Sequence, residues 1–217
     1  MFYTVFHLHR SLVSDFDAVY NIFQGLCAVA KLCHFIVRER NIYLTADAAV
    51  ADERVGAVFA ALDSLGIPYI RFEHDATATM EDCAAVGKAL EGTICKNLFL
   101  CNRQQTAFYL LTMPGDKPFH TKDLSAQIGS SRLSFAPPEK MEELLNTHPG
   151  SASVMGLLFD TEHRVQLVMD RDVYDAEYFC CHPCDNHGSL KIKTSDLLTK
   201  FLPHVGHEPI VVDLPRE

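Results

Sequence analysis

Two polar side chains open an apolar stretch in the middle of the chain. Residues 95–101 read CKNLFLC, so Lys96 and Asn97 stand directly before three large apolar residues. Such a run is typical of a buried strand, where an unpaired charge or amide would cost on the order of several kcal/mol. On a strand, neighbouring side chains point to opposite faces. The pattern indicates either a functional pair with one residue facing a cleft, or a strand end whose lysine reaches solvent.

A second polar cluster lies nearer the carboxyl terminus, where residues 181–188 read CHPCDNHG. Its proline and glycine predict a loop between strands, and loops carry functional residues disproportionately often. Cys181, His182, Cys184 and His187 are of the types that bind zinc. However, this is a single Cys-x-x-Cys pair, whereas structural zinc sites usually draw their other ligands from a second, separated pair. We therefore predict no metal.

A third candidate is the loop at residues 149–153, which reads PGSAS. Glycine with small neighbours lets backbone groups approach a ligand closely. Such groups can orient a water molecule or stabilise an oxyanion without a catalytic side chain. A tight connection between a helix and a strand has the same composition, and the spacing alone favours that simpler interpretation.

The elements that must position these motifs are helices interleaved with strand hairpins. We expect an α/β (α+β) fold without the strict alternation of a doubly wound parallel sheet. Asp47 is the expected N-cap of the first helix of the domain, which ends at Gly66. The predicted helices are 47–66, 79–92, 123–127, 138–145 and 195–201, with a helical turn at 172–176 and a further helix near 19–30. The predicted strands are 68–72, 93–101, 107–111, 155–159, 165–169, 178–181, 189–192 and 210–213.

Composition narrows the class of protein. The chain has 217 residues, 48% hydrophobic and 22% charged, which suits one sizeable core. The sequence contains no stretch of about twenty apolar residues that could span a membrane. Charged residues interrupt its first residues, unlike a signal peptide, so we expect a cytoplasmic protein. Its eight cysteines are then expected to be reduced and mostly part of the core, which disfavours a nucleophilic thiol.

The charge distribution bears on nucleic-acid binding. A net charge of −9 argues against broad binding to a nucleic-acid backbone. Yet residues 88–140 contain seven basic and four acidic residues. One face could carry enough positive potential for the end of a nucleic acid.

Several of these segments together resemble a known family, the prolyl-tRNA editing domains. These are the YbaK-like, freestanding relatives of the insertion domain of bacterial prolyl-tRNA synthetase. The segments are CKNLFL at 95–100, RLSFA at 132–136, PGS at 149–151, GLL at 156–158, His182-Pro183 with Asn186, and GHE at 206–208. Their order and spacing agree from about Val55 to the end, and they most resemble the branch that deacylates alanyl-tRNA(Pro). Residues 1–45 lie outside the resemblance, so we expect an extension of unknown role followed by one domain at 46–217.

The resemblance implies a mixed, largely antiparallel sheet flanked by helices. It implies hydrolysis of a mischarged aminoacyl ester on tRNA(Pro), with alanyl-tRNA(Pro) as the expected substrate and water as the nucleophile, without metal or cofactor. The expected partner is the acceptor end of aminoacyl-tRNA(Pro), with neither a membrane nor DNA, and the oligomeric state is left open. The alternative is a noncatalytic module of the same fold that binds the tRNA 3′ end or the aminoacyl ester.

Site residues follow from the resemblance by position. The implied catalytic residues are Lys96, Gly150 and His182, and the implied substrate-binding residues are Asn97, Ser151 and Asn186. Lys96 would bind or polarise the substrate and Asn97 would support the site. The chain departs from the family at two points. Val154 stands where the loop usually has proline, which loosens the backbone there, and Phe159 replaces the usual asparagine before Asp160.

Overall fold

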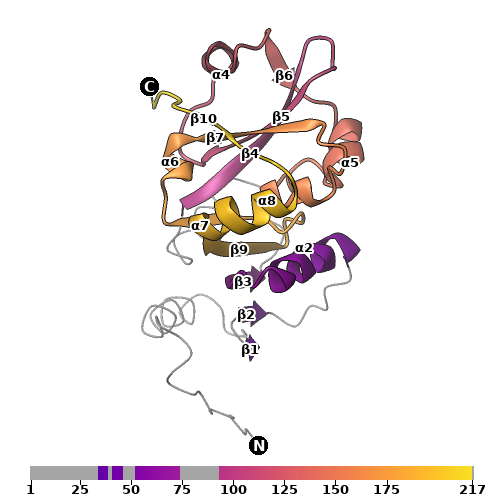
Figure 1. Cartoon of the computed structure of the whole chain (residues 1–217), viewed down its shortest axis with the longest axis vertical. Helices are drawn as coiled ribbons and strands as arrows, with labels where there is room; N and C mark the ends of the chain where they lie inside the picture. The colour runs from indigo at the N-terminus through magenta and orange to yellow at the C-terminus, as the bar shows by residue number, and fades with distance from the viewer. Residues whose placement is uncertain (1–33, 39–40, 46–51, 74–92, 217) are drawn as a thin grey trace, which may run out of the picture.

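The computed structural model describes residues 34–38, 41–45, 52–73 and 93–216, and these residues form one mixed sheet with helices on both faces (Figure 1). The strands are β1 (His34–Arg38), β2 (Asn41–Thr45), β3 (Tyr69–Glu73), β4 (Thr93–Asn102), β5 (Phe108–Pro114), β6 (Leu133–Phe135), β7 (Val165–Asp170), β8 (Tyr178–Cys181), β9 (Gly188–Lys193) and β10 (Ile210–Val212). The helices predicted near 19–30 and at 79–92 lie outside the described residues.

The sheet is organised around β4. Its order is β1-β2-β3-β9-β8-β4-β5-β7-β10, and β6 adds to β4. The antiparallel pairs are β1 with β2, β3 with β9, β8 with β9, and β4 with both β5 and β6. The parallel pairs are β2 with β3, β4 with β8, β5 with β7, and β7 with β10. The mixed, largely antiparallel sheet is therefore confirmed, and β4 joins its two halves.

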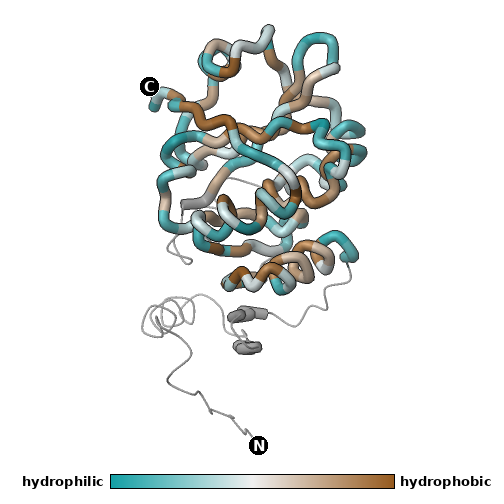
Figure 2. Tube along the Cα trace, in the orientation of Figure 1, coloured by the Kyte–Doolittle hydropathy of each residue, from teal (hydrophilic) through white to brown (hydrophobic). Residues whose placement is uncertain are grey.

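Helices cover the two faces of this sheet. They are α2 (Glu53–Ser64), α4 (Thr121–Ile128), α5 (Pro138–Leu145), the short 3₁₀ helix η1 (Val154–Leu158), α6 (Arg171–Tyr174), α7 (Thr194–Asp196), the π-helical turn η2 (Leu197–Phe201) and α8 (Leu202–His204). Helices α2 and α5, with the α7 to α8 segment, contribute to a large first core. Helix α4 packs on the other face, in a smaller second core. Figure 2 shows apolar residues alternating with polar ones along α2, as expected for a helix with one buried face.

The alternation of β4 between the two cores fixes the direction of its side chains. Cys95, Phe99 and Cys101 belong to the first core. Leu100 belongs to the second core, and Leu98 packs against it. Since side chains alternate along a strand, Asn97 faces the first core and Lys96 faces the second. The expectation that these two neighbours point to opposite faces is met.

Helix boundaries agree closely with the sequence where end signals are strong. Helix α5 spans 138–145 as predicted, with Pro138 at the first helical position, where a missing N–H does no harm. Helix α2 needs one correction, because its N-cap is Asp52 and not Asp47. The Asp52 carboxylate accepts a hydrogen bond from the Arg54 backbone N–H at 2.9 Å.

The strand predicted at 155–159 is wrong, because this segment is the 3₁₀ helix η1. Its first four residues are buried, and a short apolar run has no periodicity to separate strand from helix. The Ser153 side chain caps η1 by accepting from the Met155 N–H. Gly156 then packs on the end of α5, where a Cβ would lie 3.0 Å from the Leu145 carbonyl oxygen. Strands β1, β2 and β6 were not predicted.

Candidate active site

Two of the polar motifs meet where strand β4 separates from strand β8. These strands run parallel, and their ladder ends at the pair of Ile94 and Cys180. Lys96 lies two residues beyond this pair on β4, and His182 lies two residues beyond it, directly after the last residue of β8. From there β4 continues as the partner of β5. The strand register therefore brings Lys96 and Asn97 to the level at which the β8–β9 loop begins.

Asn97 presents an unsatisfied oxygen on the first-core face. Its Oδ1 atom is buried and accepts no hydrogen bond within the described part of the chain. A buried polar atom without a partner costs about 1–3 kcal/mol. Such atoms are rare in native proteins, and each calls for a specific explanation. A substrate group that donates to Oδ1 would supply one.

Lys96 carries its charge to the other face. The Lys96 ammonium donates to the backbone carbonyl oxygens of Lys117 and, at 3.5 Å, of Gly115. Burial lowers the pKa of Lys96, although the neighbouring Asp116 carboxylate acts in the opposite direction. A lysine ammonium has three donors. Two are directed at the turn after β5, which leaves one N–H without an acceptor among the described residues.

The glycine loop is shaped by its own hydrogen bonds. The Ser151 N–H and hydroxyl donate to the His148 carbonyl oxygen at 2.9 and 3.0 Å, and the His148 N–H donates back to the hydroxyl at 3.1 Å. Between them Gly150 has φ +91°, a conformation that favours glycine. Apart from Gly150 and its two chain neighbours, the only described atom within 4 Å of a Cβ built on Gly150 would be Asn186 Nδ2, at 3.9 Å. The backbone at Gly150 is thus exposed to a space beside Asn186.

One hydrogen bond and one close approach join this loop to the β8–β9 loop. Gly150 approaches Asn186, and the buried Ser153 hydroxyl donates to the His182 carbonyl oxygen at 2.5 Å. The His182 ring is oriented separately, because its Nδ1 donates to the Gly188 carbonyl oxygen at 2.7 Å. The β8–β9 loop is therefore held at both ends, with its middle beside the glycine loop.

The structure brings together four of the six predicted site residues, namely Gly150, Ser151, His182 and Asn186, on two loops in contact. Asn97 lies at the same end of β4 and faces the same core. The Lys96 side chain leaves β4 on the opposite face, and its described hydrogen bonds go to the turn at 115–117. The candidate site thus spans the beginning of β4, with a loop cluster on one face and an ammonium on the other.

The sequence did not predict the ion pair that fixes the turn at 115–117, whose carbonyl oxygens accept from Lys96. The Lys117 ammonium forms a buried ion pair with Asp170, at 3.0 and 2.9 Å to its two carboxylate oxygens, and it reaches Asp172 at 3.3 Å. Lys117 is 2% exposed and Asp170 is fully buried. The same lysine whose carbonyl accepts from Lys96 is therefore fixed through its side chain. The role of Ser153 was also missed, although a serine directly before an apolar helical turn is a recognisable N-cap signal.

The cysteines of this region are poor nucleophiles. Burial raises the pKa of Cys180 and of Cys184 to about 12 and raises the pKa of Cys181 further. The thiolate is the reactive form, so these thiols are inert near neutral pH. Among residues 34–38, 41–45, 52–73 and 93–216, no three His, Cys, Asp or Glu side chains gather as a metal site would require.

Both departures from the family pattern occupy defined positions. Val154 is the buried first residue of η1, directly after the N-cap Ser153. Phe159 lines a cavity of about 750 Å³ together with Asn146 and residues 52–54. Asp160 holds the following turn by accepting from the backbone N–H groups of Arg164 and Val165 at 3.0 and 2.7 Å. None of the six predicted site residues lines that cavity.

The sequence is similar to known proteins over the region that contains these motifs. The model of the aminoacyl-tRNA editing domain family matches residues 74–200. Prolyl-tRNA editing protein ProX of Acetoanaerobium sticklandii is 33% identical over 141 residues, which are 65% of this chain and 86% of ProX. Prolyl-tRNA synthetase associated domain-containing protein 1 of Danio rerio is 30% identical over 153 residues, which are 70% of this chain and 82% of that protein.

A solved structure shares the fold. A proposed trans-editing enzyme for prolyl-tRNA synthetase superposes with a TM-score of 0.57 and 17% identity, over 76% of this chain and 99% of that one. No helix in the described residues is long and apolar enough to span a membrane. The family model covers more than half of the sequence and includes all six predicted site residues. This chain belongs to the family of aminoacyl-tRNA editing domains.

Proposed function

We propose that the protein is a trans-editing hydrolase that deacylates mischarged tRNA(Pro), with alanyl-tRNA(Pro) as its substrate. Water attacks the carbonyl carbon of the aminoacyl ester, the bond to the ribose oxygen breaks, and the products are the free amino acid and tRNA with its hydroxyl restored. We infer a cytoplasmic location, because the substrate is an intermediate of translation. The family and the name of ProX support an editing activity.

The observation that carries this proposal is the contact between the two loops beside β4. Gly150, with an exposed backbone and a positive φ, has Asn186 beside it, and Ser153 joins its loop to His182 by a hydrogen bond. An ester carbonyl bound beside Gly150 would meet backbone groups that are already in position. Preorganised donors of this kind stabilise the developing oxyanion without reorganisation during the reaction.

The two residues that open β4 would act on different parts of the substrate. We propose that the 3′ end of the tRNA crosses β4 at this point. Asn97 then accepts a hydrogen bond from the aminoacyl group, on the face of the loops, through its buried Oδ1. Lys96 uses its remaining N–H on the terminal nucleotide, on the other face. Fixing the ester near a water molecule and a vicinal hydroxyl supplies much of the rate by proximity alone.

Selectivity for a small amino acid would come from exclusion. A pocket that adds contacts for one methyl group gains only about 1–3 kcal/mol, which is too little to separate alanine from larger residues by attraction. A cramped site that rejects larger side chains discriminates more strongly. The buried Val154 at the end of the glycine loop is a candidate for part of this steric limit.

The test is single-turnover deacylation of alanyl-tRNA(Pro) by the full chain and by Lys96→Ala. Because Lys96 is proposed to hold the terminal nucleotide, losing its charge-assisted hydrogen bond, worth about 1.5–3 kcal/mol, should lower kcat/KM by about 10- to 100-fold. Lys140→Ala is the matched control, because Lys140 lies on α5 and pairs with the exposed Glu143. Unchanged turnover in Lys96→Ala would reject the role of Lys96. A wild-type protein that binds the tRNA without any hydrolysis would instead establish the noncatalytic module.

A further inference from the structure

One aromatic side chain on the Lys96 face of the sheet is left in solvent. Phe135, on β6, is 65% exposed, and the other large hydrophobic residue exposed in the described structure is Ile210, at 38%. Burying a phenylalanine typically stabilises a fold by about 1.5–3 kcal/mol. Phe135 contributes little of this to the isolated chain, although its neighbours Leu133 and Ala136 are buried.

The neighbours of Phe135 form a partly apolar surface. The ring of Phe119 meets the ring of Phe135 edge to face, with 6.5 Å between the centroids. Phe119 is half-buried and packs against the second core, so it supports Phe135 from below. The Phe135 ring, 65% exposed, is therefore open to contact with a bound molecule.

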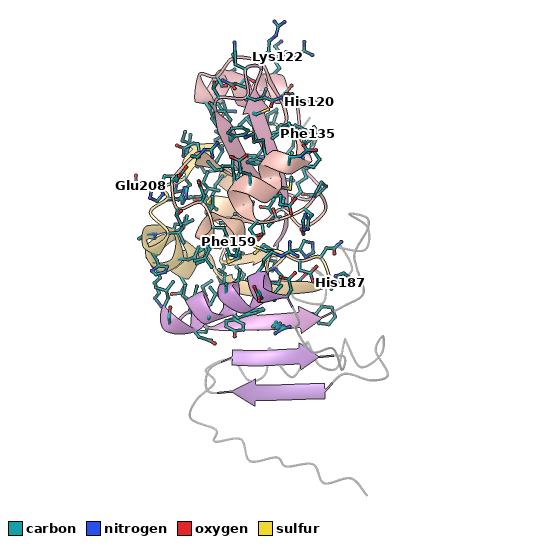
Figure 3. The ribbon with its side chains drawn as sticks, turned by 90° about the vertical axis from the view of Figure 1, so that its right-hand side faces the viewer. His120, Lys122, Phe135, Phe159, His187 and Glu208 are labelled. Carbon is teal, nitrogen blue, oxygen red and sulfur yellow. The ribbon has the colours of Figure 1, made fainter. Side chains whose placement is uncertain are left out.

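The rim of this surface is basic. His120, Lys122 and Arg132 are exposed and come from the same two segments of chain as the aromatic pair. Figure 3 shows His120, Lys122 and Phe135 close together at one end of the molecule. The chain as a whole has a net charge of −9. The two cations Lys122 and Arg132 near the exposed Phe135 ring are therefore a departure from the general surface, and they match the charge of a phosphate backbone.

Strand register connects this surface to the candidate site. Phe135 is paired with Leu100 on β4, four residues beyond Lys96 and on the same face. At about 3.3 Å per residue this separation is about 13 Å along the strand. A stacked nucleic-acid strand rises about 3.4 Å per nucleotide. Leu98 and Leu100, between these two points, pack in the second core. An RNA whose last nucleotide lies at Lys96 would therefore cross the outside of this core and meet Phe135 several nucleotides from its end.

We propose that Phe135, supported by Phe119, is a stacking platform for an unpaired base near the 3′ end of the tRNA, with Lys122 and Arg132 beside the adjacent phosphates. This rests on the proposed function for the identity of the RNA. Stacking on an aromatic side chain suits single-stranded nucleotides, because every base offers a flat π-face. The platform adds affinity and positions the RNA, whereas the reaction takes place at the loops.

The experiment measures the Kd of fluorescently labelled, uncharged tRNA(Pro) by anisotropy, for the intact RNA and for an RNA that lacks the unpaired 3′ nucleotides. Phe135→Ala should raise the Kd of intact tRNA by about tenfold, the effect of one lost stacking contact. It should leave the Kd of the shortened RNA unchanged. Phe135→Trp should restore binding, and Ile210→Ala, the matched exposed apolar control, should have no effect.

An unchanged Kd for intact tRNA in Phe135→Ala would overturn the platform, and so would an equal loss of affinity for both RNAs. Equal Kd values for the two RNAs in the wild-type protein would also contradict it. The measurement uses no ester, so it is separate from catalysis. A Phe135-dependent Kd in a protein that hydrolyses nothing would retain the platform and remove the deacylase. Hydrolysis with an unaltered KM in Phe135→Ala would retain the deacylase and remove the platform.

Discussion

Breaking the buried ion pair between Lys117 and Asp170 should destabilise the protein strongly. Asp170→Asn keeps the shape of the side chain but leaves the Lys117 ammonium, 2% exposed, without its main counter-charge. Removing one partner of a buried pair costs about 3–5 kcal/mol. Asp172 remains 3.3 Å from the ammonium but is 38% exposed, so it compensates only in part. We therefore expect the free energy of unfolding to fall by about 3 kcal/mol.

Equilibrium unfolding in urea measures this loss. With an m-value of about 2 kcal/mol/M, the midpoint should fall by about 1.5 M. Lys140→Met, which removes an exposed ion pair with Glu143, should leave the midpoint unchanged. The double variant Lys117→Met with Asp170→Leu should recover most of the loss, because apolar residues of similar volume can replace a buried pair at little cost.

Two results would refute this reasoning. An Asp170→Asn midpoint close to that of the wild type would mean that the pair is not the buried anchor inferred from its geometry. A double variant no better than the single one would mean that the carboxylate acts mainly through its hydrogen bonds to the Asp172 and Leu214 N–H groups. In both cases the turn that accepts from Lys96 would need a different support.

Two further predictions concern titratable groups. His207 is 6% exposed and packs edge-on against His163, and its burial lowers the pKa of His207 despite the nearby Asp160. His207 then binds a proton more readily in the unfolded chain than in the native state, so the free energy of unfolding should fall as the pH drops through about 6.5. Urea midpoints measured between pH 5 and pH 8 should show this slope. The same slope in His207→Gln would exclude His207 as its source. The raised pKa values of Cys180 and Cys184 predict that Cys180→Ser and Cys184→Ser keep wild-type turnover at pH 7. A deacylation rate at least tenfold lower in a folded variant would reveal thiol chemistry.

The sequence predicted best those features that depend on local signals. Proline at the first helical position marked the start of α5, and the apolar run 98–100 marked β4, on which the neighbours Lys96 and Asn97 had to point to opposite faces. It failed where the signal was short or shared by two structures. The apolar run of η1 was interpreted as a strand, and the three residues of β6 were too few to register.

The candidate site was partly accessible from sequence. Its loops were recognisable from proline, glycine and small residues, and the resemblance to editing domains joined them into one site. The ion-pair partner of Lys117 could not be recognised from the sequence, because Asp170 lies 53 positions away and nothing in the local pattern pairs the two. The contact between Phe119 and Phe135 has the same origin, since it depends on how α4 and β6 pack on β4.

Hydrolysis of three esters of the same tRNA tests the central claim most directly. The purified full chain would be incubated with alanyl-, cysteinyl- and prolyl-tRNA(Pro), and loss of each ester followed over time. Our account predicts rapid loss of the alanyl ester while the prolyl ester is spared. The account would be contradicted if the protein bound the tRNA but none of the three esters was lost faster than by spontaneous hydrolysis.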